Sequence, residues 1–146
     1  MITYSQRRHL PYTASQLFDL VADVESYPQF LPGVLECSIR RRHDHSIDVR
    51  MTIGIGPLRK RFSSVGLLQR PQRIDITSDD AMFERFAQSW VFTPAAAGGT
   101  DVSYRVDFQF RSRLLQVVMG TSFAERTAAT MIAFERRAHR LYGGRT

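Results

Sequence analysis

Hydrophobic and polar residues alternate along most of the chain between residues 34 and 110. A two-residue period is typical of β-strands that bury one face and expose the other. The pattern is cleanest at residues 100–110, where Val102, Tyr104 and Val106 share one side of the strand. Clusters of Pro, Gly and Asp interrupt the alternation at intervals. The pattern predicts strands at residues 35–39, 47–55, 58–68, 73–78, 83–93 and 100–110, with a further strand at residues 2–10.

Other segments have the period of a helix. Residues 14–22 are apolar at helical spacing, and Thr13 is a suitable N-cap residue. Residues 114–119 are apolar all round the axis, so we expect them to be buried on several sides or to form a mobile segment hinged near Gly120. A long C-terminal helix, ended by the glycines at 143–144, carries one apolar stripe. The stripe consists of Phe123, Thr127, Met131, Phe134, Ala138 and Leu141.

The order of these elements predicts the fold class. An antiparallel sheet has one wet and one dry face, and only the long helix is available to cover the dry face. A strongly twisted sheet around one helix closes imperfectly at one end, which leaves room for a ligand. We therefore expect a single α+β domain over residues 1–146, with a curved antiparallel sheet of about six to seven strands around the C-terminal helix.

Composition places the chain among ordinary globular proteins. It has 146 residues, of which 43% are hydrophobic and 23% are charged. Cys37 is the only cysteine, which excludes an intrachain disulfide and fits a reducing compartment. No apolar run approaches the roughly 20 residues that span a bilayer, and none follows Arg7 and Arg8 as in a secretory signal. We expect a cytoplasmic protein.

Charge adds a candidate surface. The formal net charge is +6, and Lys60 is the only lysine among twenty basic residues. Two basic runs, at residues 40–42 and 59–61, begin or end predicted strands, so we expect them to lie close together. They suggest a landing patch for an anionic membrane or for ribosomal RNA, while the competing interpretation is solvated surface. We expect no DNA partner. The candidate surface residues are Arg40, Arg41, Arg59, Lys60 and Arg61.

The sequence contains no clear catalytic or metal-binding motif. His43 and His45 flank Asp44, but zinc needs three or four protein ligands, so a polar hairpin turn is the better interpretation. Asp79 and Asp80 are neighbours, whose side chains point apart in a strand, so we interpret them as a turn. No acid–base pair can be assigned. We therefore predict a binding protein rather than an enzyme, with no cofactor and no metal.

Several segments resemble a known family over nearly the whole chain. They are Leu10-Pro11-Tyr12, the stretch at residues 17–32 with its two prolines, Phe62-Ser63-Ser64-Val65, Trp90-Val91-Phe92-Thr93-Pro94 and residues 133–138. They are similar to the helix-grip START superfamily, also described as polyketide cyclase/dehydrase. Within it they most resemble the coenzyme-Q-binding branch, which also includes the ribosome-association toxin RatA. One departure is Gly33-Val34, where the family usually has an aromatic residue and a cysteine.

The resemblance implies binding of ubiquinone or a similar isoprenoid lipid, and a supporting role in respiratory electron transport at the inner membrane. Two alternatives are a ribosome-associated factor of the RatA type and a cyclase-like enzyme. A polyprenyl quinone needs an apolar slot with a few polar groups at its head end. The candidate lining residues, which in the competing interpretation simply fill a core, are Phe30, Leu31, Met51, Ile53, Phe62, Phe86, Trp90, Tyr104, Val106, Phe108, Phe123, Met131 and Phe134.

The segment at residues 27–33 is a candidate gate. It is apolar and is bounded by Pro28 and Pro32. We interpret it as a lid over the cavity mouth, against which Leu115, Val118 and Met119 pack from the helix side. The competing interpretation is a rigid corner of the fold.

Overall fold

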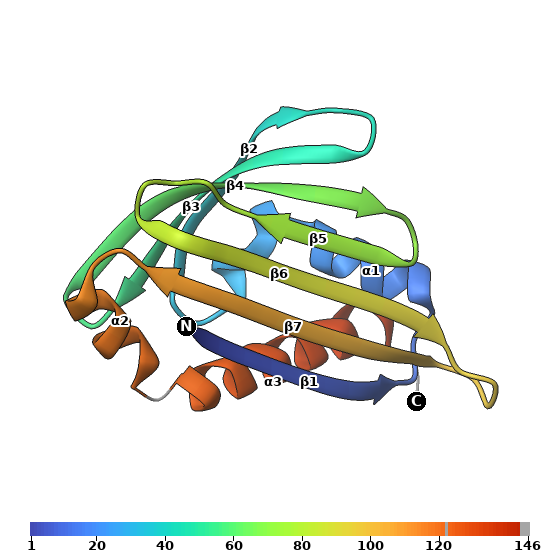
Figure 1. The fold of residues 1–146 in the computed structure, drawn as a ribbon. Helices are drawn as coiled ribbons and strands as arrows, with labels where there is room; N and C mark the ends of the chain where they lie inside the picture. The colour runs from blue at the N-terminus through green and yellow to red at the C-terminus, as the bar shows by residue number, and fades with distance from the viewer. Residues whose placement is uncertain (122, 144–146) are drawn as a thin grey trace.

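The computed structural model describes residues 1–121 and 123–143. Within these residues the chain forms one seven-stranded antiparallel sheet in the order β1-β7-β6-β5-β4-β3-β2 (Figure 1). The strands are β1 (Ile2–Leu10), β2 (Val34–Arg42), β3 (Ser46–Ile55), β4 (Leu58–Gln69), β5 (Arg73–Thr77), β6 (Phe83–Pro94) and β7 (Thr100–Phe110). The helices are α1 (Ala14–Ala22), the 3-10 helix η1 (Val24–Gln29), α2 (Arg113–Gly120) and α3 (Phe123–Tyr142).

The local sequence explains why these strands and helices form where they do. In β7, Val102, Tyr104 and Val106 are buried and lie at alternate positions, as the two-residue period predicts. At the start of α1, the Thr13 hydroxyl accepts a hydrogen bond from the Gln16 backbone at 3.1 Å, and the Gln16 side chain accepts one from the Thr13 backbone at 2.9 Å. This reciprocal capping box satisfies two backbone N–H groups that the first helical turn leaves unpaired.

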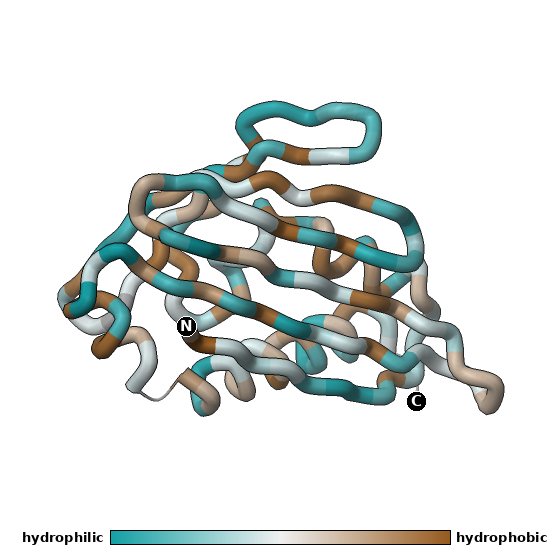
Figure 2. The backbone as a smooth tube through the Cα atoms, in the orientation of Figure 1, coloured by the Kyte–Doolittle hydropathy of each residue, from teal (hydrophilic) through white to brown (hydrophobic). Residues whose placement is uncertain are grey.

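The curved sheet holds α3 along its concave side, and α1 packs between α3 and strands β5 and β6 (Figure 1). Phe134 of α3 lies at the centre of this contact, with its ring centroid 5.1 Å from that of Trp90 and 5.5 Å from that of Tyr27. Figure 2 shows hydrophobic and hydrophilic residues alternating along the strands. The expected α+β architecture, a curved antiparallel sheet around a C-terminal helix, is confirmed.

The apolar segment at residues 114–119 is not buried on several sides, and its mobility stays a prediction. It forms α2, in which Leu114 and Val117 are 72% and 68% exposed, while Leu115 and Met119 pack against the core. The backbone N–H of Phe110 donates to the Gln116 side chain at 2.8 Å and ties α2 to the end of β7. The helix therefore has an outer apolar face. Of the glycine pair expected to end α3, Gly143 follows the last helical residue and Gly144 lies outside the described residues.

The expectation that the two basic runs lie close together is wrong. Arg41 pairs with Asp48 of β3, whereas Lys60 pairs with Ile53, so the runs lie at opposite ends of β3. Five positions along β3 correspond to about 17 Å at about 3.3 Å per residue. The reason is the register, because β2 ends where β3 begins and β4 begins where β3 ends. An irregularity in register between Ile39 and Arg41 helps all three arginines at 40–42 to stay exposed on this edge strand.

Candidate ligand-binding cavity

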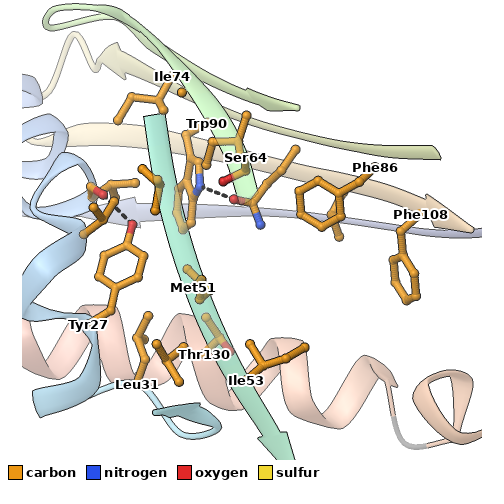
Figure 3. Close-up of a pocket in the computed structure, with 18 of the residues that line it drawn as sticks. Tyr27, Leu31, Met51, Ile53, Ser64, Ile74, Phe86, Trp90, Phe108 and Thr130 are labelled. Atoms are coloured by element: carbon orange, nitrogen blue, oxygen red, sulfur yellow. Dashed lines mark hydrogen bonds between the residues drawn. The ribbon is translucent and has the colours of Figure 1, made fainter. Parts of the chain in front are cut away.

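A cavity of about 260 Å³ lies between the concave face of the sheet and α3. Figure 3 shows Trp90 and Ser64 from the sheet, with Leu31 and Thr130 from the helical side of the same space. Most of the candidate lining residues meet here, namely Leu31, Met51, Ile53, Phe62, Phe86, Trp90, Tyr104, Val106, Phe108, Phe123 and Phe134. These residues line the cavity, and their contact with a ligand stays a prediction.

Two candidates lie outside this wall. Phe30 packs edge-on against Tyr27 and Phe134, with centroids 6.0 and 5.4 Å apart, and the Arg137 guanidinium lies 5.1 Å above its ring. Met131 borders a separate void of about 20 Å³ beside Leu17 of α1. Phe30 therefore fills a gap between η1 and α3, and Met131 packs beside α1 and the sheet. Sequence periodicity places Met131 on the apolar stripe of α3 but cannot say which neighbour that stripe meets, and Phe30 lies in a turn with no periodic pattern.

The wall also contains residues that were not expected. On the sheet, Ile47, Val49 and Ile74 continue the inward-facing positions of the strands, and Phe83 and Phe110 add to an aromatic cluster. Phe83 lies 5.3 Å from Phe62 and 5.1 Å from Phe110 between ring centroids. Strand alternation alone would have identified the three aliphatic residues. Edge-to-face and stacked aromatic pairs of this kind contribute about 0.5–1.5 kcal/mol each beyond the area they bury.

The polar side chains on the sheet side of the cavity lie on β4, β6 and β7. The Gln88 amide donates a hydrogen bond to the Tyr104 hydroxyl at 2.8 Å, and the Trp90 indole N–H donates to the Gln88 carbonyl oxygen at 3.4 Å. Burial raises the pKa of Tyr104, so its hydroxyl stays protonated and can donate. Ser64 of β4 faces the same space. Gln88, Trp90 and Tyr104 are thus joined by hydrogen bonds, and Ser64 lies on the same wall. We refer to these four residues together as the polar cluster.

The remaining polar atoms on the wall belong to α3 and η1. The Thr127 and Thr130 hydroxyls donate to backbone carbonyls one turn earlier, each at 3.0 Å, so their protons are already used. The Tyr27 hydroxyl donates to the backbone carbonyl of Val21, and burial raises its pKa. Arg126 lines the cavity near α2, with its guanidinium 3.8 Å from the Met119 sulfur. Tyr27 and Tyr104 thus favour hydrogen bonding over proton transfer.

The cavity has a closed end and an open end. Ile47, Ile74 and Trp90 are 2–3% exposed, so the cavity is sealed near them. Ile53 and Phe123, which line the other end, are only half-buried. From the partial exposure of Ile53 and Phe123 we infer that the cavity opens toward the β3–β4 turn and the start of α3.

The candidate gate is anchored at several points. Tyr27 is buried and hydrogen-bonded, the Leu31 backbone N–H donates to the Tyr27 carbonyl at 2.8 Å, and the Gly54 N–H donates to the Gly33 carbonyl at 2.9 Å. Gly33 has a φ of 83°, which favours glycine at this turn. Leu31 and Pro32 line the cavity. Helix α2 contacts β7, and the expected packing of Leu115, Val118 and Met119 against residues 27–33 stays a prediction.

The β2–β3 hairpin contains His43 and His45, the two histidines considered as metal ligands. The His43 ring lies 3.6 Å from the Asp48 carboxylate in a hairpin, and within residues 1–121 and 123–143 no three His, Cys, Asp or Glu side chains gather as a metal site would require. None of the helices over the same ranges combines the length and hydropathy needed to cross a bilayer.

Known proteins resemble this chain in sequence and fold. The family model described as polyketide cyclase/dehydrase and lipid transport matches residues 10–135. The ribosome association toxin RatA of Escherichia coli K12 is 31% identical over 136 residues, covering 93% of this chain and 86% of that protein. The mitochondrial coenzyme Q-binding protein COQ10 homolog B of Xenopus laevis is 27% identical over 146 residues, covering 97% of this chain and 60% of that protein.

Solved structures share the fold. The solution structure of an 18 kDa protein from Caulobacter crescentus aligns with a TM-score of 0.79 at 28% identity, covering 99% of this chain and 100% of that one. The Zhui aromatase/cyclase from Streptomyces aligns with a TM-score of 0.83 at 15% identity, covering 99% of both chains. A START superfamily protein from Mycobacterium smegmatis aligns with a TM-score of 0.76 at 19% identity, covering 95% of this chain and 98% of that one. The expected helix-grip START fold is confirmed, and the chain belongs to the polyketide cyclase/dehydrase and lipid transport family.

Proposed function

We propose that the protein binds ubiquinone or a related isoprenoid quinone in this cavity and supports respiratory electron transport as a quinone carrier. The observation that carries the proposal is the polar cluster on an apolar, partly aromatic wall. Ligand sites of this class combine a mostly apolar lining with a few converging hydrogen-bond groups. The relative from Xenopus laevis, a coenzyme Q-binding protein, supports the choice of a quinone.

Hydrogen-bond chemistry sets the orientation of the ligand. A quinone carbonyl only accepts hydrogen bonds, so it needs donors. Tyr104 accepts the bond from Gln88 and keeps its own proton available, and the Gln88 amide has a second N–H. The Ser64 hydroxyl is a third donor on the same wall. The ring therefore enters first, with one carbonyl near these donors.

Size limits how much of the ligand is enclosed. Pockets that bury drug-sized ligands span about 300–1,000 Å³, and the cavity of about 260 Å³ lies just below that range. It accommodates a substituted quinone ring and little of a long polyprenyl tail. The tail then leaves through the open end, past Ile53 and Phe123.

The proposal is tested by identifying what the protein carries. Organic extraction of the purified protein, followed by mass spectrometry, should recover a quinone at up to one molecule per protein chain. A Ser64→Phe variant, whose new ring occupies the cavity, should carry much less while keeping its melting temperature within a few degrees. Recovery of equal lipid from both proteins would show that the lipid is bound elsewhere.

A second candidate function is association with the ribosome. Relatives at 31% identity are ribosome association toxins, and the exposed arginines at 40–42 lie in the β2–β3 hairpin, which stands out from the sheet (Figure 1). Lys and Arg contacts to phosphates dominate the affinity of such interactions. Co-sedimentation with large ribosomal subunits, and its loss in an Arg40→Gln/Arg41→Gln/Arg42→Gln variant, would support this function. The cyclase-like alternative is supported by the family match and by the fold likeness to an aromatase/cyclase.

A further inference from the structure

The open end of the cavity brings together chain segments that are distant in sequence. The end of β7 leads into α2, Ile2 of β1 pairs with Phe108, and the β3–β4 turn lies at the same end of the sheet. Figure 1 shows α2 and this turn at one extremity of the molecule, near the N-terminus. Met119 and Phe123 bring the helical side to the cavity here.

Exposed apolar side chains concentrate at this end. Leu114, Met1 and Val117 are 72%, 69% and 68% exposed, which are the highest values among the large hydrophobic residues described. Leu114 and Val117 are three positions apart and therefore share one helical face. The opposite face of α2, with Leu115 and Met119, packs inward. An apolar helix face turned to water beside a lipid cavity is costly unless another apolar phase covers it.

Positive charge surrounds these apolar residues. Arg59, Lys60 and Arg61 are exposed at the start of β4, and Arg111 and Arg113 are exposed at the start of α2. The acidic residue nearest in sequence to Arg111 is Asp107, which is paired with Arg105 at 3.2 Å. Glu125 lies in the first turn of α3, and Asp79 and Asp80 lie between β5 and β6. The Asp80 carboxylate accepts backbone hydrogen bonds from Met82 at 3.0 Å and from Ser63 at 3.2 Å. The excess charge at this end is therefore positive.

We propose that this end, the mouth face, docks on an anionic phospholipid bilayer. The mouth face consists of Met1, Arg59, Lys60, Arg61, Arg111, Arg113, Leu114 and Val117. Leu114 and Val117 enter the interface between headgroups and acyl chains, and the basic residues contact the lipid phosphates. The cavity then faces the bilayer, so a quinone ring passes directly between the two. This use of the docking surface rests on the proposed quinone binding, whereas the docking itself is measured without ligand.

The charge arm of the test compares two matched triple variants. Ligand-free protein is floated with vesicles of phosphatidylglycerol and phosphatidylcholine, and with vesicles of phosphatidylcholine alone. The Arg59→Gln/Lys60→Gln/Arg61→Gln variant should lose roughly a hundredfold in affinity for the anionic vesicles, which corresponds to about 3 kcal/mol at about 1 kcal/mol per charge. The Arg40→Gln/Arg41→Gln/Arg42→Gln variant removes the same charge from the other end of β3 and should lose less than threefold.

The apolar arm of the test compares exposed apolar residues of α2 with exposed apolar residues of α3. Leu114→Gln/Val117→Gln should weaken vesicle binding at least tenfold, while Ile132→Gln/Leu141→Gln, which alters two exposed apolar residues of α3, should change it little. Both double variants keep residues that suit a helix, and circular dichroism checks that they fold.

The outcomes separate docking from quinone binding. Quinone affinity is measured for the same variants in detergent, where the mouth-face substitutions should leave it unchanged. Absence of wild-type binding to anionic vesicles, or equal losses in both triple variants, would overturn the docking proposal. The proposal would be overturned as well if the Arg59→Gln/Lys60→Gln/Arg61→Gln variant lost binding to ribosomal subunits and kept its binding to vesicles. Vesicle binding without any quinone affinity would retain the docking surface and refute the quinone function.

Discussion

Replacing Leu31 with alanine tests whether the segment at residues 27–33 controls ligand release. Leu31 is 7% exposed and lines the cavity. Leu→Ala in a core costs about 2–5 kcal/mol, including a term for the new void. Because Leu31 already borders a cavity of about 260 Å³, the change enlarges a void rather than creating one. We therefore expect a loss near the lower limit, about 2 kcal/mol, and a fall in melting temperature of about 4–8 °C.

The effect of Leu31→Ala on the ligand is separate and is measured per folded molecule. Losing one or two methyl contacts, at about 0.8 kcal/mol each, weakens quinone binding roughly tenfold. Stopped-flow quenching of tryptophan fluorescence should place this change in faster dissociation. Leu20→Ala is the matched control, since Leu20 is 4% exposed but lies outside this cavity. A large stability loss in Leu31→Ala with unchanged affinity and dissociation rate would make the segment a rigid corner instead of a gate.

Three further changes have definite expected results. Gln88→Leu removes the partner of Tyr104 and Trp90, so quinone affinity should fall about tenfold in a fluorescence titration, and unchanged affinity would exclude the polar cluster as the head-group site. Burial, with a smaller contribution from Glu25, raises the pKa of the Cys37 thiol to about 11. Alkylation of Cys37 by iodoacetamide should therefore be slow at pH 8 and accelerate up to about pH 11. A midpoint of the alkylation rate below pH 9 would contradict this. Thr13→Ala breaks the capping box and should cost about 1 kcal/mol in urea denaturation, whereas no change would show that the cap is dispensable.

The sequence predicts the secondary structure well because each strand has one buried face. The strand expected at 100–110 matches β7, and that expected at 73–78 extends one residue beyond β5. Alternation also assigns most of the cavity wall, because Met51, Phe62 and Trp90 occupy inward positions. Periodicity fails where the buried side of an element has more than one neighbour. Met131 shares the apolar stripe with Phe134 but borders a different void.

Other features were missed for different reasons. The separation of the two basic runs follows from the strand order, because two consecutive antiparallel hairpins place their turns at opposite ends of β3, and the predicted strands already implied it. The inward-facing Gln88 is polar, so hydrophobic alternation hides it. In α2 every side looks apolar from the sequence, and only the fold reveals that Leu114 and Val117 remain exposed.

The central claim is that the cavity holds a quinone ring, and Trp90 reports on it directly. It is the only tryptophan of the chain, it lines the cavity, and it is 3% exposed. Titration of the purified protein with a short-tail ubiquinone analogue in detergent should quench its fluorescence saturably, at about one analogue per chain. The Ser64→Phe variant should show only the weak, unsaturated quenching of a collisional process. Equal, unsaturated quenching in both proteins would contradict quinone binding in this cavity.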